Sequence, residues 1–507
     1  MKNLIINLSN NFLIKILTFG IALFIARYFG SNELTDTYFT AATIPLWLFT
    51  VITYALNSAY IPVYQKIITE RGQNDANAFF NTFLVIGAII IVIIGIITWF
   101  IIPIIFSLLL IGFTKYELNN TISILKIFIF AFVIEFIVNI LSTIFILNKK
   151  FIYLGLVNNA LPFTVILSVI FLHKSYTIFS LPYGYLWGTI LQLLIAVFLI
   201  GKSKIYLIGS FKFVKEDFVQ ITKLLFASLL GLISYPIFAL GIRGLASRLQ
   251  EGSISAIDYT EKLMSQIPYA IATAFAISIY PDITKYWAEK DNSNFDSVII
   301  RNIRMLVFLL TPIAIFIGFN SIEVTKLFFM RGSFTIENVI VVANLIKIYS
   351  LKFICVFYEV IFSFALFASQ NVIKSVIASV AGLIFGLAAS YLLLNALKLE
   401  GIALGLNLGF LVQAILTSFF YYGISSKKKD IRKIIYYNAK MLVISGILIF
   451  ITKFIFLVTF KITYIIPIFF VFFAFYFMIG FYLKEPILLR IIKSFKNKLF
   501  SISFTQN

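Results

Sequence analysis

The chain has 507 residues, of which 61% are hydrophobic and only 12% are charged, and its formal net charge is +20. A soluble domain cannot bury so much apolar surface, so the composition excludes an ordinary globular protein and favours an integral membrane protein. Because there is one cysteine, Cys355, and one histidine, His173, an internal disulfide and a Cys/His metal cluster are excluded within one chain.

Fourteen apolar ranges follow one another along the chain, and each can cross a hydrocarbon core of about 30 Å. The first is predicted to be a membrane helix rather than a cleaved signal, because it contains Lys15 and lacks a small-x-small cleavage site before Arg27. In chain order the ranges are 4–27, 37–62, 80–111, 121–147, 152–173, 179–201, 218–247, 254–283, 302–320, 338–368, 372–397, 400–423, 436–460 and 462–483.

Residues of the first six ranges recur in the next six at a fixed offset of 221 residues, which predicts an internal duplication. The recurring pairs are Arg27 and Arg248, Tyr38 and Tyr259, Lys126 and Lys347, Gly188 and Gly409, and Gln192 and Gln413. Six helices per copy is an even number, so both copies insert in the same orientation, and duplicated bundles of this kind mostly belong to transporters.

The expected fold is an all-α integral membrane protein of about 14 transmembrane helices. Two six-helix lobes in parallel repeat surround a central cavity, and two C-terminal helices follow them. The N-lobe is expected at 1–201, a cytoplasmic linker at 202–217, and the C-lobe at 218–424. Residues 425–507 then hold a basic loop, helices 13 and 14 and a cytoplasmic tail. Lysine and arginine concentrate in alternate loops, which predicts cytoplasmic termini and explains the positive charge without nucleic acid.

Polar groups inside hydrocarbon are costly, so their positions suggest function. Helices 1, 2, 7 and 8 carry polar faces that are expected to meet in the cavity. The cations Lys15, Arg243 and Lys262 would bind an anionic group such as phosphate. Asp36, Asp258 and Glu261 could each pair with one of these cations. The alternative is that the polar stripes only join helices through hydrogen bonds.

Two carboxylates, Glu135 and Glu359, lie in the middle of helices 4 and 10 and are 224 residues apart, close to the repeat offset. Each is a candidate proton or cation site coupled to transport. The alternative is a local ion pair with Lys126 or Lys352. Neither alternative is favoured over the other.

Several segments resemble one known family. They are residues 26–45, residues 243–263, the Arg-Gly-Ser-Phe-Thr turn at 331–335 and the end of helix 10 at 366–371. In these segments the chain resembles the MurJ/MviN lipid II flippases of the multidrug/oligosaccharidyl-lipid/polysaccharide exporter superfamily. The resemblance implies a bacterial cytoplasmic membrane protein for peptidoglycan synthesis. It would flip an undecaprenyl-pyrophosphate-linked saccharide by alternating access, with membrane lipids and cell-wall synthesis proteins as partners.

By position, Lys15 and Lys262 match cavity arginines of that family, and Asp36, Ser255 and Glu261 match cavity positions beside them. Lysine keeps the charge but loses the bidentate fork of arginine. The range 372–397 has no acidic residue, so the sodium site of some relatives is not evident. No cofactor or metal is expected.

Three other functions are alternatives to this one. A flippase for an O-antigen or capsule repeat unit differs only in its glycan. A multidrug antiporter should have more acidic than basic cavity residues, and here basic residues are at least as many. A membrane-embedded glycosyltransferase needs catalytic carboxylates or histidine, usually on a large outer loop. The longest outward loop, 321–337, holds only Glu323 and Glu337, so no enzyme is expected.

Overall fold

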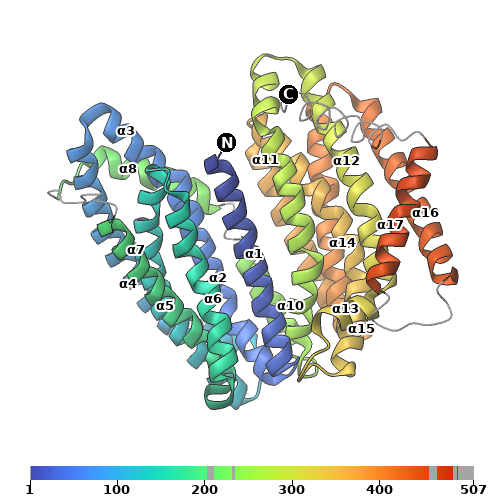
Figure 1. Cartoon of the computed structure of the whole chain (residues 1–507), viewed down its shortest axis with the longest axis horizontal. Helices are drawn as coiled ribbons and strands as arrows, with labels where there is room; N and C mark the ends of the chain where they lie inside the picture. Colours follow the sequence, from blue (N-terminus) through green and yellow to red (C-terminus); the bar gives the residue numbers. More distant parts are fainter. Residues whose placement is uncertain (1, 203–210, 231–233, 456–464, 484–487, 489–507) are drawn as a thin grey trace, which may run out of the picture. The chain divides into compact units, whose positions relative to one another are not determined.

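The structure is a computed structural model that describes residues 2–202, 211–230, 234–455, 465–483 and 488. Every regular element in these residues is a helix (Figure 1). Within the described residues the predicted apolar ranges are almost entirely helical, so the prediction of an all-α protein is confirmed for them. Residues 231–233, 456–460 and 462–464 of these ranges lie outside the described residues. Nine helical segments of the described residues are long and apolar enough to cross a membrane, as a multi-pass membrane protein requires.

The first half of the chain forms α1 (Lys2–Phe29), α2 (Glu33–Ala55), the π-helical turn η1 (Leu56–Tyr60), α3 (Ile61–Arg71), α4 (Gln73–Leu109), α5 (Lys115–Leu147), α6 (Phe151–Tyr176), the 3-10 turn η2 (Thr177–Phe179), α7 (Ser180–Lys202), α8 (Lys215–Leu230) and α9 (Ser234–Ala246). The second half forms α10 (Ser253–Met264), α11 (Gln266–Ala288), α12 (Asn292–Phe319), α13 (Ser321–Phe329), α14 (Ile336–Ala368), α15 (Val372–Ile424), α16 (Lys428–Ile455) and α17 (Ile465–Tyr482). Lys398, at φ 48°, divides α15 into the two helices that the sequence predicts there.

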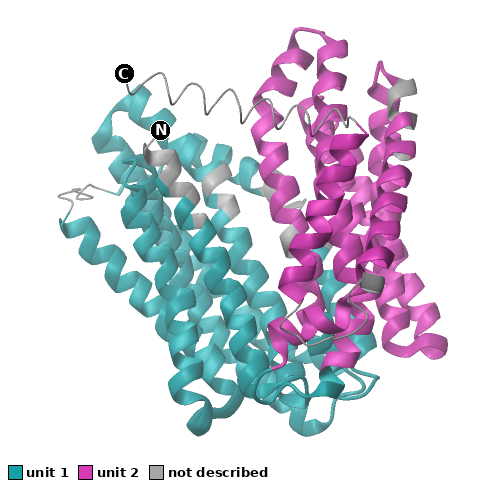
Figure 2. Ribbon diagram, turned by 45° about the vertical axis from the view of Figure 1, so that its right-hand side comes forward, with its two compact units in different colours: residues 1–258, 331–338 teal, residues 259–330, 339–507 magenta. Residues whose placement is uncertain are grey.

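The chain folds into two compact units, which Figure 2 shows in different colours. Unit 1 comprises residues 1–258 and 331–338, and unit 2 comprises residues 259–330 and 339–507. These units follow contacts rather than the sequence repeat, so the predicted boundaries of the lobes stay a prediction.

The core of unit 1 includes an aromatic cluster between α2, α5 and α7. The ring of Phe128 on α5 lies 5.1 Å from that of Tyr185 on α7, and Phe49 on α2 stacks on Phe132 at 6.3 Å. In unit 2, α12 packs on α16 and α17, and the buried hydroxyl of Tyr476 donates to the Phe308 carbonyl oxygen at 2.9 Å. Both units therefore pair large rings across neighbouring helices, which buries apolar area and fixes the helices laterally.

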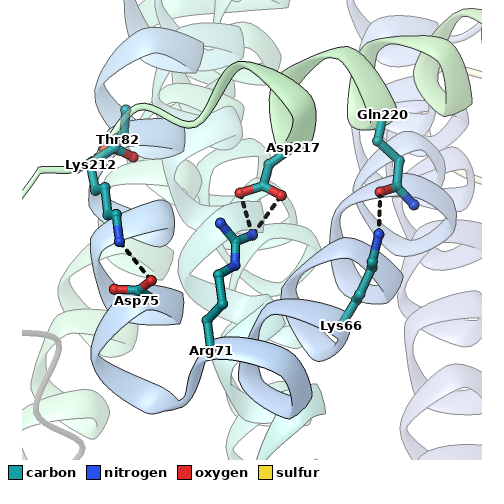
Figure 3. Close-up of polar contacts among 7 residues, drawn as sticks. All are labelled: Lys66, Arg71, Asp75, Thr82, Lys212, Asp217 and Gln220. Carbon is teal, nitrogen blue, oxygen red and sulfur yellow. Dashed lines mark hydrogen bonds and ion pairs between the residues drawn. The ribbon is translucent and has the colours of Figure 1, made fainter.

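Ionic contacts hold the start of α8 against the α3–α4 hairpin (Figure 3). Arg71 Nη2 donates to Asp217 Oδ1 and Oδ2 at 2.6 and 2.5 Å, and these hydrogen bonds raise the pKa of the Arg71 guanidinium. Lys212 Nζ lies 2.7 Å from Asp75 Oδ2, while Lys66 Nζ donates to Gln220 Oε1 at 3.3 Å.

The range 218–247, predicted as one helix, contains two helices, α8 and α9. Residues 231–233 between them lie outside the described residues.

Candidate functional site

Three segments of unit 1 meet at the end of α1, and we call them the Asp36 junction: residues 27–36, 251–255 and 331–338. Asp36 lies in the first turn of α2 and is only 4% exposed. Its Oδ2 accepts from the Gly252 amide at 2.8 Å, and its Oδ1 accepts from the Ser255 amide at 2.7 Å. These amides stand at the start of α10, where the helix dipole favours an anion. One carboxylate thus satisfies two amides that a capping box would satisfy with two local side chains.

Hydroxyl and amide groups reinforce the same junction. Ser31 Oγ donates to the Gly252 carbonyl oxygen at 3.0 Å and lies 2.7 Å from Ser255 Oγ, which is fully buried. The third segment joins through the Ser333 amide, which donates to the Arg27 carbonyl oxygen at 2.8 Å, and through Asn338 Nδ2, which donates to Ser31 O at 3.1 Å. The junction is therefore a closed hydrogen-bonded contact of three loops.

Glycine is required where these loops approach one another. Gly252 has φ +86°, and a Cβ there would lie 2.8 Å from the Ser31 carbonyl oxygen. Gly332 has φ +59°, and a Cβ there would overlap the Arg27 carbonyl oxygen. Both positions combine a left-handed backbone with close backbone contact, so neither accepts a side chain without displacement.

Arg243 on α9 pairs with Asp258 on α10, also within unit 1. Arg243 Nη2 donates to Asp258 Oδ1 at 2.9 Å and lies 2.7 Å from Oδ2, and the two side chains are 11% and 18% exposed. The sequence analysis named Asp258 as a candidate partner for a buried cation, and the structure forms this pair. Lys15, by contrast, is exposed on α1, on the same face as Thr18.

In unit 2, Glu261 on α10 binds Lys352 on α14. Lys352 Nζ lies 2.6 Å from Glu261 Oε1, and the lysine side chain is 3% exposed. The ammonium group also lies 4.0 Å from the centre of the Phe410 ring, as in a cation–π contact. Lys262, the next residue, is half-buried. Lys352 was not predicted as the partner of Glu261, although a lysine in the middle of an apolar range indicates that a buried anion is near.

The two duplicated carboxylates are not paired with the lysines named as alternatives. Lys126 lies over the Trp99 ring at 4.7 Å, and Lys352 is paired with Glu261. Glu135 Oε1 instead accepts from Asn139 Nδ2 at 2.9 Å, and Glu359 Oε1 accepts from Ser363 Oγ at 3.3 Å. Their role in coupling stays a prediction.

The structure thus brings Asp36 and Ser255 into direct contact. It gives Arg243 and Glu261 partners of opposite charge, the half-buried Asp258 and the buried Lys352. Buried charges on apolar helices are typical of membrane transporters. Among solved structures, the fold is similar to "Lipid II flippase MurJ, inward closed conformation", with a TM-score of 0.79, 21% identity, and coverage of 95% of this chain and 100% of that chain. It is also similar to an inward-facing multidrug resistance MATE family transporter of the MOP superfamily, with a TM-score of 0.71, 14% identity, and coverage of 85% of this chain and 98% of that chain.

The long apolar helices define the class as a multi-pass membrane protein, and its fold is shared by MurJ and MATE proteins. The family described as "Lipid II flippase MurJ" matches residues 25–485. The chain belongs to this lipid II flippase MurJ family, which confirms the resemblance carried by the sequence segments.

Curated relatives agree with this assignment. The "Probable lipid II flippase MurJ" of Borreliella burgdorferi is 25% identical over 460 residues, which cover 87% of this chain and 86% of the relative. The "Lipid II flippase MurJ" of Burkholderia cenocepacia is 21% identical over 410 residues, which cover 77% of this chain and 78% of the relative.

Proposed function

We propose that this protein translocates lipid II, an undecaprenyl-pyrophosphate-linked saccharide, across the bacterial cytoplasmic membrane for peptidoglycan synthesis. The observation that carries the proposal is the family match over residues 25–485, nearly the whole chain. The relatives of similar length that bear the name of lipid II flippase support it. The protein acts as a transporter rather than an enzyme.

The substrate site in this proposal consists of Lys15, Asp36, Arg243, Ser255, Glu261 and Lys262. Lys15 and Lys262 attract the pyrophosphate, since lysine is a point charge that suits phosphate oxygens. Asp258 fixes the position of the Arg243 guanidinium group. In this proposal Arg243 therefore orients the anionic headgroup rather than attracting it as an unpaired cation. Asp36 and Ser255 hold the Asp36 junction, whose opening and closing accompanies transport.

The mechanism is alternating access. Substrate binding drives a change of state only by favouring one conformation over the other. The proposal includes the finer features predicted from the sequence: fourteen membrane helices, two six-helix repeats with a central cavity, cytoplasmic termini and contacts with cell-wall synthesis proteins. Moving net positive charge toward a negative cytoplasm contributes about 2.3 kcal/mol per charge per 100 mV, so the membrane potential can reset a basic site.

Complementation tests the proposal directly. The chain is expressed in cells depleted of their own lipid II flippase, and survival and lipid II translocation are scored. Rescue by the wild type that is lost in Lys15→Gln and Lys262→Ala is the expected result. Lys115→Gln, which changes an exposed lysine at the start of α5, is the control and should rescue. Failure of the wild type, with the protein present in the membrane, would exclude lipid II as its substrate and favour another undecaprenyl-linked glycan.

A further inference from the structure

Glu135 is a buried carboxyl group with half of its hydrogen-bonding capacity unused. It lies on α5 and is 8% exposed. Asn139 Nδ2 donates to Oε1 at 2.9 Å, but Oε2 has no hydrogen-bond partner among the described residues. A carboxylate buried without compensating donors or a countercharge takes up a proton rather than remain ionised. An O–H on Oε2 would make this group neutral.

Among the described residues, no positively charged side chain pairs with Glu135. Phe128 and Phe132 share its face of α5, and buried tyrosines on the elements packed against α5 include Tyr38 on α2, Tyr185 on α7 and Tyr60 on η1. The charged side chains of α5 and its neighbours have other partners or lie at helix ends; they include Glu33, Asp36, Asp75, Glu117, Lys126, Lys150, His173, Lys174 and Lys202.

A line of polar side chains connects Glu135 to an exposed residue. Thr53, which is exposed on α2, donates from Oγ1 to Asn139 Oδ1 at 2.8 Å. Asn139 then donates to Glu135 Oε1. Three consecutive polar side chains thus form a hydrogen-bonded line from the surface of α2 to the buried carboxyl group.

Glu359, the similarly placed carboxyl group of the second sequence copy, has more hydrogen-bond donors around it than Glu135 has. Glu359 has Ser363 as a donor, and Gln413 lies beside its carboxylate. The counterpart of Gln413 is Gln192 on α7, 3% exposed, whose Oε1 also has no partner among the described residues. Two buried side-chain oxygens of the first copy, Glu135 Oε2 and Gln192 Oε1, thus have no partner among the described residues.

We propose that Glu135 is the proton-binding site of the transport cycle: a proton enters past Thr53 and Asn139, forms an O–H bond at the Glu135 carboxylate, and leaves by the reverse step. This inference rests on the proposed function and names its coupling ion. Thr53 and Asn139 act as positioning residues. The C-terminal carboxyl group, Glu359, serves as the matched comparison.

Infrared difference spectroscopy tests proton binding without any transport. The full-length protein in lipid nanodiscs is compared between acidic and alkaline buffer, and the carbonyl band of a protonated carboxylic acid is followed. A component of this band should disappear in Glu135→Gln and remain in Glu359→Gln. Thr53→Val should shift the pH profile of that component, whereas Thr50→Val, an exposed threonine that bonds only to Leu46 O, should not. A Glu135→Gln spectrum identical to that of the wild type would overturn the proposal.

Flipping of lipid II in proteoliposomes tests the coupling. A pH gradient should change the wild-type rate several-fold and leave the Glu135→Gln rate unchanged. A sodium gradient at constant pH that drives the wild type and fails to drive Glu135→Gln would overturn the proton assignment. If the wild type moves no lipid II, the proposed function fails, while the infrared titration still decides whether Glu135 binds a proton.

Discussion

The carboxylate of Asp36 accepts a hydrogen bond from the Ser255 amide at 2.7 Å, although the two residues are 219 positions apart in the chain. Asp36 lies in the first turn of α2, and Ser255 lies in the first turn of α10. The contact therefore joins two helices that are far apart in the chain through a single buried side chain. It gives Asp36 a structural role that its identification as a cavity residue does not include.

Asp36→Asn tests this role. Asparagine keeps one acceptor but brings an NH2 group toward an amide donor, so one of the Gly252 and Ser255 amides is left unsatisfied. The change should lower the free energy of unfolding by about 1–3 kcal/mol and reduce transport. Thermal unfolding in detergent and complementation measure the two effects. Glu33→Gln, in the same helical turn, is the control, and equal losses in both variants would contradict the cap assigned to Asp36.

Gly252→Ala and Gly72→Ala separate backbone strain from steric overlap. The two glycines have φ +86° and +87°, but only Gly252 has a neighbour in the way, because nothing lies within 4 Å of a Cβ at Gly72. Gly72→Ala should cost about 1–3 kcal/mol, because the backbone at φ 87° and ψ 175° is in a region that essentially only glycine adopts. Gly252→Ala should cost clearly more, because the Ser31 carbonyl must move. Equal unfolding temperatures for the two variants would show that the junction is loosely packed.

Much of the fold follows from the sequence because hydrocarbon thickness sets a minimum length for each apolar helix. Hydropathy averages over a window as long as a membrane span, so it does not resolve short features. The range 254–283 was therefore predicted as one helix, and the structure has α10 and α11 with Ser265 between them. The short helix α13 likewise lies inside a range expected to be a loop.

The site was less predictable than the fold. Sequence patterns identify that Asp36, Arg243 and Glu261 are polar groups on apolar helices, but a pairing partner is a tertiary property. Glu261 and Lys352 are 91 residues apart, and no periodicity connects them. The Arg243–Asp258 pair could be predicted from the sequence, because the two residues are 15 positions apart on consecutive helices.

A charge reversal tests how α8 is attached to unit 1. Arg71→Asp removes the donor to Asp217 and places two carboxylates together, so α8 should detach more readily from the α3–α4 hairpin. Because the Arg71 side chain is 28% exposed, the loss should be modest, about 1 kcal/mol. The rate of limited proteolysis near residues 211–217 measures it. Arg71→Asp combined with Asp217→Arg should restore the wild-type rate, and no recovery would show that the ion pair is not the attachment.

A double-mutant cycle tests the buried pair of unit 2. Lys352→Met leaves the Glu261 carboxylate without its partner, and Glu261→Gln leaves the ammonium group of Lys352 unbalanced. Each single change should lower the free energy of unfolding by about 3–5 kcal/mol, because removing one partner of a buried ion pair leaves an uncompensated charge. Thermal unfolding and expression level measure this. The double variant, Lys352→Met with Glu261→Gln, should recover most of the stability, since it buries no charge.

Transport by the double variant separates the two roles of Glu261. If the carboxylate takes part in substrate binding as well as in the ion pair, the double variant is folded and inactive in complementation. Lys374→Met, a lysine elsewhere in the same unit, controls for the loss of a positive charge. Full activity of a stable double variant would remove Glu261 from the substrate site and leave it a purely structural partner of Lys352. Losses that simply add in the cycle would show that the two side chains act independently, against the 2.6 Å contact between Nζ and Oε1.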